Sequence, residues 1–446
     1  MLSRSQPALL ASVLLLGGVS DAQSPPDPDY VRTPVYDTYQ DFWAAVDAAT
    51  SIPAAAERAA AVSDLWHTLT DAGQVPFAID DRVAFLYRGG ASSVSWRGDF
   101  NRWGEARGRR LGQSDLWIYE TAFPADARTD YKVFLNGSDW RLDPSNPLQM
   151  WGGFGPNSEL RMPSYAYPHE TIRRPGVARG TLSNNVRMAT DRLPHDVNYR
   201  VYTPAGYGAS ENGLGALTDL PTVYVTDGHE YTAEHMGSMT AALDNLIADG
   251  KLAPTIAVFI DPRDPVSGSN RRQELYVANE SFADFVADDL MPAIDAAYRT
   301  DARPESRTIL GTSLGGFFSG YLGAVRPDAV RNLALQSPAL GGSLPRILRQ
   351  APPLGQNIVM TGGTFGDDAT PDLIAATLTD LDIDFEYTKV NDGHSWGAWR
   401  GQLGELLLAT IGPPVPEPAA AAAVITASGV AAAVGRRGPR AAVTAR

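Results

Sequence analysis

The sequence of 446 residues contains no cysteine. This absence excludes disulfide bonds, zinc thiolate sites, iron–sulfur ligation and a cysteine nucleophile, and it leaves the redox compartment open. Lysine is almost missing as well, because only Lys132, Lys251 and Lys389 are present and arginine supplies nearly all the positive charge. Acidic residues outnumber basic ones by 51 to 37, for a net charge of −14. This balance argues against a general nucleic-acid binder, which must neutralise phosphates.

The composition is otherwise that of a globular protein. Apolar residues make up 44% of the chain and charged residues 20%, which excludes a mainly disordered or fibrous protein. Because single cores rarely grow beyond about 250–300 residues, the length predicts two or three domains.

The N-terminus has the pattern of a secretory signal. Arg4 precedes a leucine-rich apolar run over residues 8–19, and Ser20-Asp21-Ala22 places small residues where a signal peptidase reads them. The apolar run is too short to span a bilayer. We therefore predict a signal peptide over residues 1–22, the alternative being a disordered terminus.

Three elements follow one another at the C-terminus. Pro416-Glu417-Pro418 is followed by an uncharged Ala- and Val-rich segment over 419–435, then by Arg436, Arg437 and Arg440. This order resembles the PEP-CTERM sorting signal of Gram-negative bacteria. The resemblance implies that residues 412–446 form a tail read by export and sorting machinery at the membrane, with only transient membrane contact. The protein would then be exported to the periplasm, the cell envelope or the medium. An Ala-rich disordered tail is the alternative.

Pattern shifts divide the region between the two ends. Residues 23–75 read as a linker and two short helices, at 39–49 and 54–72, from apolar residues at helical spacing. Residues 76–165 show short alternating strands broken by glycine, at 83–87, 93–96, 117–119 and 131–135, as in an antiparallel sandwich. Residues 176–411 alternate strand-like runs with helical stretches. That alternation predicts an α/β domain with a mostly parallel sheet and helices on both faces.

A candidate nucleophile lies in this α/β region. The stretch 311–315 reads Gly-Thr-Ser-Leu-Gly and fits G-x-S-x-G, between a strand-like run at 308–310 and a helical run at 317–325. A strained strand-to-helix turn exposes such a serine at the top of the sheet. The helix N-terminus then offers backbone N–H groups and a positive dipole end to a developing oxyanion. Ser313 is the predicted nucleophile.

A serine nucleophile needs a base and an orienting acid. Among the six histidines, His394 follows the strand-like run 385–390 in a loop, where a triad histidine is expected. The acid should come between serine and histidine in the chain. Asp367 and Asp368 follow the run 358–360 and cannot be separated by sequence, so Asp367 is preferred, Asp368 is the alternative, and a different acid remains open.

Several stretches of the α/β region together carry a family resemblance. They are Tyr202-Thr203-Pro204-Ala205-Gly206-Tyr207, Asp227-Gly228, Arg271 with Glu274-Leu275, Leu290-Met291-Pro292, residues 311–316, and Gly393-His394 with Trp399-Arg400. As a set they resemble the putative-esterase family of α/β hydrolases, which includes enterochelin esterases, esterase D-like enzymes and feruloyl or acetyl-xylan esterases. The resemblance implies an α/β-hydrolase fold, Ser313 as nucleophile and His394 as base. It also implies an oxyanion hole from the Leu314 N–H and an N–H near His229.

The same resemblance assigns Arg271 to substrate binding, and Glu230 is a second predicted substrate-binding residue. For Arg271 an ion pair with Glu274, one helical turn on, is an equal alternative. The preceding strands resemble the Ig-like domain that stands ahead of enterochelin esterases. There Trp103 and Trp140 could stack on sugars or aromatic rings, or could pack in the sandwich core.

The sequence therefore predicts an exported serine esterase that cleaves carboxylic esters through an acyl-enzyme, without a metal or organic cofactor. One substrate class is a catechol-type siderophore ester. A carbohydrate esterase acting on feruloyl or acetyl groups, with an acylated sugar as substrate, is the alternative. A non-catalytic envelope or matrix binding protein is a third reading, which the presence of Ser313, His394 and an acid disfavours.

Overall fold

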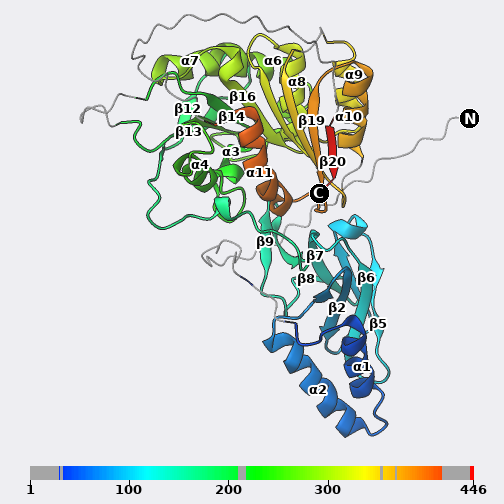
Figure 1. Cartoon of the computed structure of the whole chain (residues 1–446). Helices are drawn as coiled ribbons and strands as arrows, with labels where there is room; N and C mark the ends of the chain where they lie inside the picture. Colours follow the sequence, from blue (N-terminus) through cyan, green and yellow to red (C-terminus); the bar gives the residue numbers. More distant parts are fainter. Residues whose placement is uncertain are drawn as a thin grey trace, which may run out of the picture.

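The computed structural model describes residues 30, 34–208, 217–351, 355–366, 369–413 and, for their backbone, 442–445. In Figure 1 the described chain forms three stacked parts, which are a helix pair, a β-sandwich and an α/β domain. The predicted signal peptide and most of the predicted tail lie outside the described residues, as do Asp367 and Asp368.

The helix pair covers one sheet of the sandwich. α1 (Tyr39–Thr50) and α2 (Ala55–Asp71) place Phe42, Val62 and Leu69 against the first sheet, whose strand order is β1-β2-β6-β5. These strands are β1 (Phe77–Ile79), β2 (Arg82–Arg88), β5 (Arg109–Arg110) and β6 (Leu116–Ala122).

Strand β2 is buried on both faces. Ala84 and Leu86 belong to the core beneath the helices, whereas Val83 and Phe85 belong to the core between the two sheets. Because side chains alternate along a strand, this double burial explains the unbroken apolar run from Val83 to Leu86.

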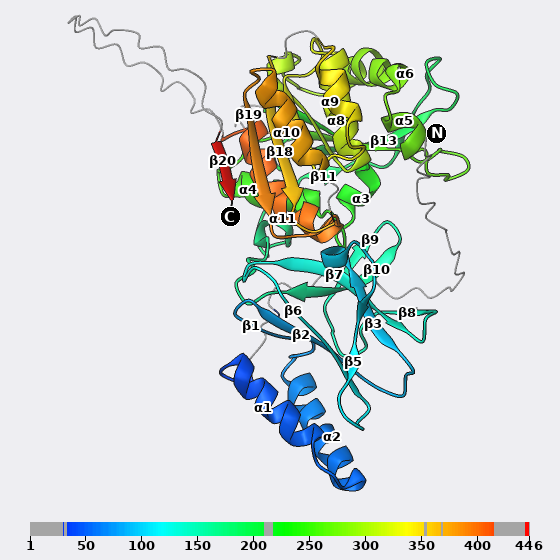
Figure 2. The ribbon, with the colours of Figure 1, turned by 90° about the vertical axis from the view of Figure 1, so that its right-hand side faces the viewer.

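The second sheet of the sandwich faces the α/β domain. Its order is β4-β3-β7-β10-β9, with β8 paired to β7. The strands are β3 (Val94–Gly98), β4 (Ala106–Arg107), β7 (Arg128–Leu135), β8 (Asp139–Arg141), β9 (Gln149–Gly152) and β10 (Gly155–Arg161), with a 3-10 turn at Asp99–Asn101. In Figure 2 this sheet lies directly under the loops that follow β18 and β19.

The two tryptophans singled out by sequence lie near the surface of the second sheet. Trp140 is 47% exposed, its ring centroid is 6.4 Å from that of Trp103, and Arg97 lies over it. The buried tryptophans of the sandwich core are Trp96 and Trp117 instead. Sugar stacking by Trp103 and Trp140 stays a prediction, and so does the Ig-like assignment of the sandwich.

The α/β domain has a sheet of order β11-β13-β15-β14-β16-β17-β18-β19-β20, with β12 paired to β13. Strands from β15 to β20 are parallel, and β13 is antiparallel to β15. Their bounds are β11 (Thr181–Leu182), β12 (Val186–Met188), β13 (Val197–Thr203), β14 (Thr222–Val225), β15 (Ile256–Asp261), β16 (Arg307–Thr312), β17 (Asn332–Gln336), β18 (Asn357–Gly363), β19 (Phe385–Val390) and β20 (Ala442–Ala445). β20 comes from the predicted tail.

Helices cover both faces of this sheet. One face carries α4 (Met239–Ala248) and α11 (Trp396–Thr410), and the other carries α8 (Leu314–Val325) with its neighbours. The remaining helical segments are α3 (Gly228–Thr232), α5 (Arg272–Tyr276), α6 (Glu280–Asp284), a π-turn at Phe285–Leu290, α7 (Met291–Ala297), α9 (Ser343–Leu348) and α10 (Thr370–Asp380), with 3-10 turns at His169–Thr171 and Pro304–Ser306. The predicted α/β-hydrolase fold is thus present, preceded by a β-rich domain.

In the part of the chain that the structure describes, no helix is both long enough and apolar enough to cross a membrane.

Candidate active site

Ser313 stands on a sharp turn between β16 and α8. Its backbone adopts φ 56° and ψ −115°, a region that L-residues with a side chain rarely occupy. Such strain persists only where the surroundings over-determine the conformation. Here the Ser313 N–H donates to the Gln336 carbonyl of β17, 2.9 Å away, and the Ser313 carbonyl accepts from Phe317 in α8. The turn therefore projects the hydroxyl beyond the carboxyl end of β16.

The glycines around Ser313 are required by packing. A Cβ on Gly311 would overlap Thr226 Oγ1 and the carbonyl group of Gly315, and a Cβ on Gly315 would overlap Thr226 Oγ1 as well. Strand β16 and helix α8 thus cross with no room for a side chain. This contact accounts for both glycines of the G-x-S-x-G pattern.

The neighbouring strand β14 delivers the segment 227–230 beside Ser313. β14 and β16 are parallel neighbours, with Val225 opposite Leu310, so their carboxyl ends open at the same edge. Asp227 has a left-handed backbone (φ 52°), and short helix α3 starts after it. The N–H groups of a first helical turn lack intrahelical acceptors. The placement fits the predicted oxyanion hole of Leu314 and His229, which stays a prediction.

Asp227 itself is fully buried and ion-paired. Arg272 donates to both of its carboxylate oxygens, at 2.7 and 2.9 Å, and the Asp227 N–H donates to the Tyr276 hydroxyl. Burial raises the pKa of Asp227, and Arg272 opposes that shift. The ion pair fixes the turn that leads into α3.

His394 reaches Ser313 from the loop between β19 and α11. The distance between His394 Nε2 and Ser313 Oγ is 3.0 Å, within hydrogen-bond reach. The His394 ring packs edge-on against Trp399, with centroids 5.1 Å apart. The structure thus brings together the two residues that the sequence assigned as nucleophile and base, although 81 positions separate them.

The predicted acid, Asp367 or Asp368, lies outside the described residues, but the chain just before it is described. A Cβ on Gly366 would stand 3.5 Å from His394 N and 3.7 Å from His394 Cβ. The segment after β18 therefore runs alongside His394 up to the residue before Asp367.

Two titratable groups on α3 face the site region with shifted pKa values. Burial lowers the pKa of His229 to about 4, against the attraction of Asp261, so the imidazole is neutral at pH 7. Burial and Asp227 raise the pKa of Glu230 to about 7. Glu230 Oε1 would lie only 2.9 Å from a Cβ on Gly153, at the tip of the β9–β10 hairpin. The sandwich therefore touches the residue predicted to bind substrate.

Arg271 forms ion pairs, including the one with Glu274 that the sequence offered as the alternative to substrate binding. It pairs with Glu274 at 3.0 Å and with Asp264 at 3.4 Å, and 38% of its side chain is exposed. The neighbouring Arg272 is the arginine that reaches the site, through Asp227. The sequence did not predict the ion pair of Arg272 with Asp227. The only sequence signal for it was that Arg272 lies next to Arg271.

The sequence also gave no role to the side chains that hold the His394 loop. Arg128 of β7 is fully buried and donates to Asp392 Oδ1 and to Ser395 Oγ, both at 3.1 Å. Burial raises the pKa of Asp392 to about 7, against the attraction of Arg128. Asp392 stands two residues before the histidine, which was the only sequence signal for it. Arg128 had none.

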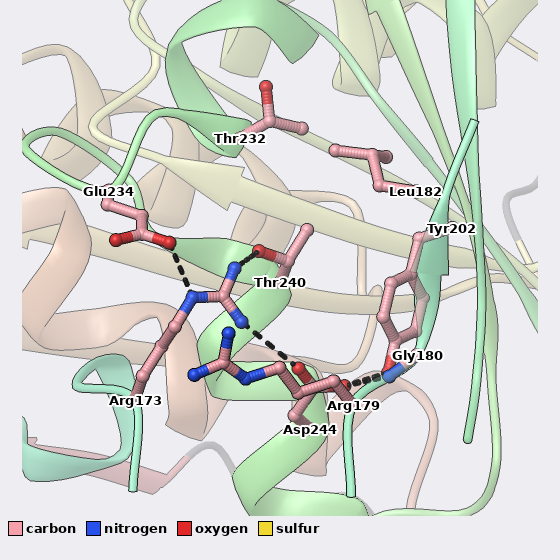
Figure 3. Close-up of a pocket in the computed structure, with 9 residues that line it drawn as sticks. All are labelled: Arg173, Arg179, Gly180, Leu182, Tyr202, Thr232, Glu234, Thr240 and Asp244. Atoms are coloured by element: carbon pink, nitrogen blue, oxygen red, sulfur yellow. Dashed lines mark hydrogen bonds and ion pairs between the residues drawn. The ribbon is translucent and has the colours of Figure 1, made fainter. Parts of the chain in front are cut away.

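A separate cavity of about 330 Å³ lies between the segment 173–182 and helix α4 (Figure 3). Arg173 crosses it to Glu234 and Thr240, and Tyr202 donates to Asp244 at 2.7 Å. Its charged lining is largely paired within itself. Ser313 and His394 are not among the residues that line it.

Comparison with known proteins places this chain among esterases. A family model described as "Putative esterase" matches residues 190–369. This match covers the greater part of the α/β domain. The matched region contains Ser313, and His394 follows it.

Two curated relatives are similar over different spans. The iron(III) enterobactin esterase of Escherichia coli O6:H1 is 24% identical over 341 residues, covering 67% of this chain and 80% of the relative. An endo-1,4-beta-xylanase/feruloyl esterase of Xylanibacter ruminicola is 32% identical over 133 residues, or 29% of this chain. The chain spans only 18% of the length of that second relative.

Solved structures share the fold. The enterobactin esterase of Shigella flexneri superposes with a TM-score of 0.61 at 19% identity, covering 73% of this chain and 92% of that one. An enterobactin esterase from Salmonella typhimurium gives a TM-score of 0.60 with similar coverage. Both spans are longer than the α/β domain alone.

Proposed function

We propose that this carboxylic ester hydrolase is an exported serine esterase that acts through an acyl-enzyme on Ser313. The observation that carries the proposal is the 3.0 Å separation of His394 Nε2 and Ser313 Oγ at the carboxyl edge of the sheet. A serine on a strained strand-to-helix turn, with an imidazole in reach, is the arrangement that activates a hydroxyl for attack.

The reaction follows from the positions of these groups. His394 takes the proton of Ser313 as its oxygen attacks the ester carbonyl, and returns that proton to the leaving alcohol. The N–H of Leu314, with an N–H near His229, would hold the tetrahedral oxyanion. Water then cleaves the acyl-enzyme by the same route. No step requires a metal or an organic cofactor.

The proposed third member of the triad is Asp367, with Asp368 as the alternative. The contact of Gly366 with His394 supports this assignment, since the next residues in the chain are these two acids. A carboxylate at that point would accept from His394 Nδ1 and stabilise the imidazolium that forms.

For the substrate, a siderophore-type ester with catechol acyl groups is the first proposal. It is supported by the similarity to enterobactin esterases over a span longer than the α/β domain alone. The alternative is a feruloyl ester of a carbohydrate, which the relative from Xylanibacter ruminicola favours over a shorter span. Export rests on residues 1–22 and 412–446, and partners in the sorting machinery belong to the same proposal.

The test is turnover of p-nitrophenyl acetate and butyrate by the wild type, Ser313→Ala and a matched serine variant. Loss of the nucleophile should lower kcat by about 10⁴- to 10⁶-fold. Ser319→Ala is the control, because Ser319 lies within α8, which follows Ser313, and its hydroxyl donates to the Gly315 carbonyl. Equal turnover by wild type and Ser313→Ala would overturn the proposal. A second assay, with a catechol trilactone and a feruloylated sugar, then ranks the two substrate classes.

A further inference from the structure

The loop that carries His394 makes side-chain and backbone contacts with the sandwich domain as well as with its own domain. The attachment begins at Asn391. The Arg128 N–H donates to the Asn391 carbonyl at 2.9 Å, and the Asn391 side chain donates through Nδ2 to the Asp126 carboxylate at 2.8 Å. Arg128 is the first residue of sandwich strand β7, and Asp126 precedes it. The start of the histidine loop is therefore tied to the edge of the sandwich.

The Arg128 guanidinium continues this attachment on both sides of the histidine. Nη1 donates to Asp392 Oδ1 and to Ser395 Oγ, each at 3.1 Å, so one nitrogen joins the residues that bracket Gly393 and His394. Nε donates to Glu159 of β10 at 2.6 Å, and Nη2 pairs with Asp130 of β7. Sandwich carboxylates thus fix the planar Arg128 guanidinium, which at the same time binds the His394 loop of the α/β domain.

Two glycines of the loop region leave room for sandwich side chains. A Cβ on Gly393 would overlap the Asp99 carboxylate, and a Cβ on Gly397 would overlap the Arg128 guanidinium. Neither glycine has a left-handed backbone that would demand it. The run Asp392-Gly393-His394-Ser395-Trp396-Gly397 is therefore shaped by the sandwich at four of its six positions.

The same interface supports the segment that precedes the predicted acid. Phe365 packs edge-on against Phe123 of the sandwich, with centroids 5.4 Å apart, and its N–H donates to the Asp392 carbonyl at 3.0 Å. Both loops that approach Ser313 from the β18–β19 side thus rest on the β-rich domain.

We propose that Arg128 is a positioning residue for His394, so that the sandwich domain completes the active site across the domain boundary. This inference rests on the proposed function, because it assigns a role within the same Ser313–His394 pair. Arg128 acts through Asp392 and Ser395. A displacement of about 1 Å at a reacting group can lower a rate about 100-fold, and Arg128 would prevent such a displacement.

The experiment uses the full chain with three substitutions at the contact. Arg128→Lys keeps a charge but cannot span Asp392, Ser395 and Glu159 together, and it should lower kcat about 10- to 100-fold with KM changed less than about threefold. Ser395→Ala removes only the hydroxyl that accepts from Arg128, and should lower kcat about threefold. Arg128→Met should be the least active, since it leaves buried carboxylates unpaired. If Arg128→Met does not fold, Arg128→Lys and Ser395→Ala still test whether Arg128 positions His394.

Arg307→Lys is the matched control. Arg307 is another largely buried arginine, paired with Asp295, but it lies at the start of β16 whereas Ser313 follows the end of that strand. Its replacement should leave kcat within about twofold of the wild type.

Active-site titration separates positioning from a merely structural role. A fluorophosphonate counts the reactive Ser313 sites, and p-nitrophenyl butyrate turnover is then expressed per titrated site. A structural role would reduce the number of sites and leave kcat per site unchanged. The proposal predicts a lower kcat per site in Arg128→Lys. A kcat per site within twofold of the wild type overturns it.

Hydrogen exchange provides a readout that does not need turnover. Amides of residues 391–397 should exchange faster in Arg128→Lys than in the wild type, while those of residues 313–325 should not change. Unchanged exchange at 391–397 overturns the proposal. If the wild type lacks Ser313-dependent turnover, the proposed function has failed, and this exchange measurement decides the positioning role separately.

Discussion

The two members of the Ser313–His394 pair are held by different parts of the molecule. Ser313 is fixed within the α/β domain, where Gly311, Gly315 and Thr226 pack strand β16 and helix α8 together without intervening side chains. His394 is fixed from outside that domain, because Arg128 and Asp99 of the sandwich shape the loop that carries it. One side of the site is locally built and the other depends on a domain interface.

The difference has a physical reason. A strand-to-helix turn is formed by residues that are close together in the sequence, so a few small residues in a row are enough to form it. The loop after β19 is not part of a comparable strand-to-helix turn of small residues. It gains its fixed shape from a buried arginine that satisfies carboxylates of both domains. The nucleophile side should therefore respond mainly to changes in its own domain, and the histidine side to changes in the other.

The largest effect is expected on the nucleophile side, from Gly311→Ala. Its Cβ would overlap backbone atoms of Gly315 as well as Thr226 Oγ1, and backbone cannot give way cheaply. We expect a loss of about 3 kcal/mol or more of unfolding free energy, together with loss of esterase activity. Urea unfolding measures the first and p-nitrophenyl ester turnover the second. Gly342→Ala is the control, because a Cβ there would meet nothing within 4 Å. Equal stability of the two variants would contradict the account of this turn.

On the histidine side, Gly397→Ala should affect activity through the other domain. The new methyl group would displace the Arg128 guanidinium, so we expect kcat to fall about 10-fold or more. A double-mutant cycle with Arg128→Lys measures the coupling of the two positions. The loss from Gly397→Ala should be smaller in the Arg128→Lys background.

Gly401→Ala serves as the control for this cycle. It lies one helical turn further along α11, where the nearest atom to a Cβ is Tyr165 Oη at 3.9 Å. Additive effects of Gly397→Ala and Arg128→Lys would show that the two residues act independently. That result would contradict the coupling of the His394 loop to the sandwich through Arg128.

A smaller effect concerns the pH dependence of stability. Asp392 accepts from Arg128 of β7 and interacts with the carboxylates of Asp130 and Asp99, and its burial raises its pKa to about 7. Because the folded state holds this proton more tightly than the unfolded state, the group's contribution to stability is lost as pH rises from about 4 to 7. Asp392→Asn should therefore flatten the decline of unfolding free energy over that range, as measured by urea unfolding at several pH values.

His229 contributes an opposite slope in the same range, since its pKa is lowered to about 4, but it is unchanged in this comparison. Asp264→Asn is the control. Backbone hydrogen bonds from Ser267 and Val266 lower the pKa of Asp264 to about 2, so its contribution is lost only as the pH falls below about 4. An unaltered slope in Asp392→Asn would count against a raised pKa at the interface.

The smallest effect is expected from Arg271→Ala. Its ion pair with Glu274 is exposed and its ion pair with Asp264, 3.4 Å long, is partly exposed, and exposed pairs contribute at most about 1 kcal/mol. We expect stability and kcat/KM for p-nitrophenyl butyrate to change little. Arg272→Ala, next in the chain, should cost much more, because it leaves buried Asp227 without its partner. A large loss from Arg271→Ala alone would restore the substrate-binding role predicted from sequence.

The sequence predicted those features that short-range patterns encode. The helices at 39–49 and 54–72 and most strands appear within a few residues of their expected places, and the α/β-hydrolase fold is present. Ser313 and His394 could be found because a strand–turn–helix and a loop after a strand have local signatures. Arg128 could not, since nothing near it in the chain marks a residue that binds Asp392, 264 positions away.

The central claim is that Ser313 is a nucleophile activated by His394. Intact-protein and peptide mass spectrometry after treatment with a fluorophosphonate tests it most directly. The account predicts a single adduct on Ser313, absent in Ser313→Ala and formed far more slowly in His394→Ala. No adduct, an adduct on another serine, or an equal labelling rate in His394→Ala would contradict it.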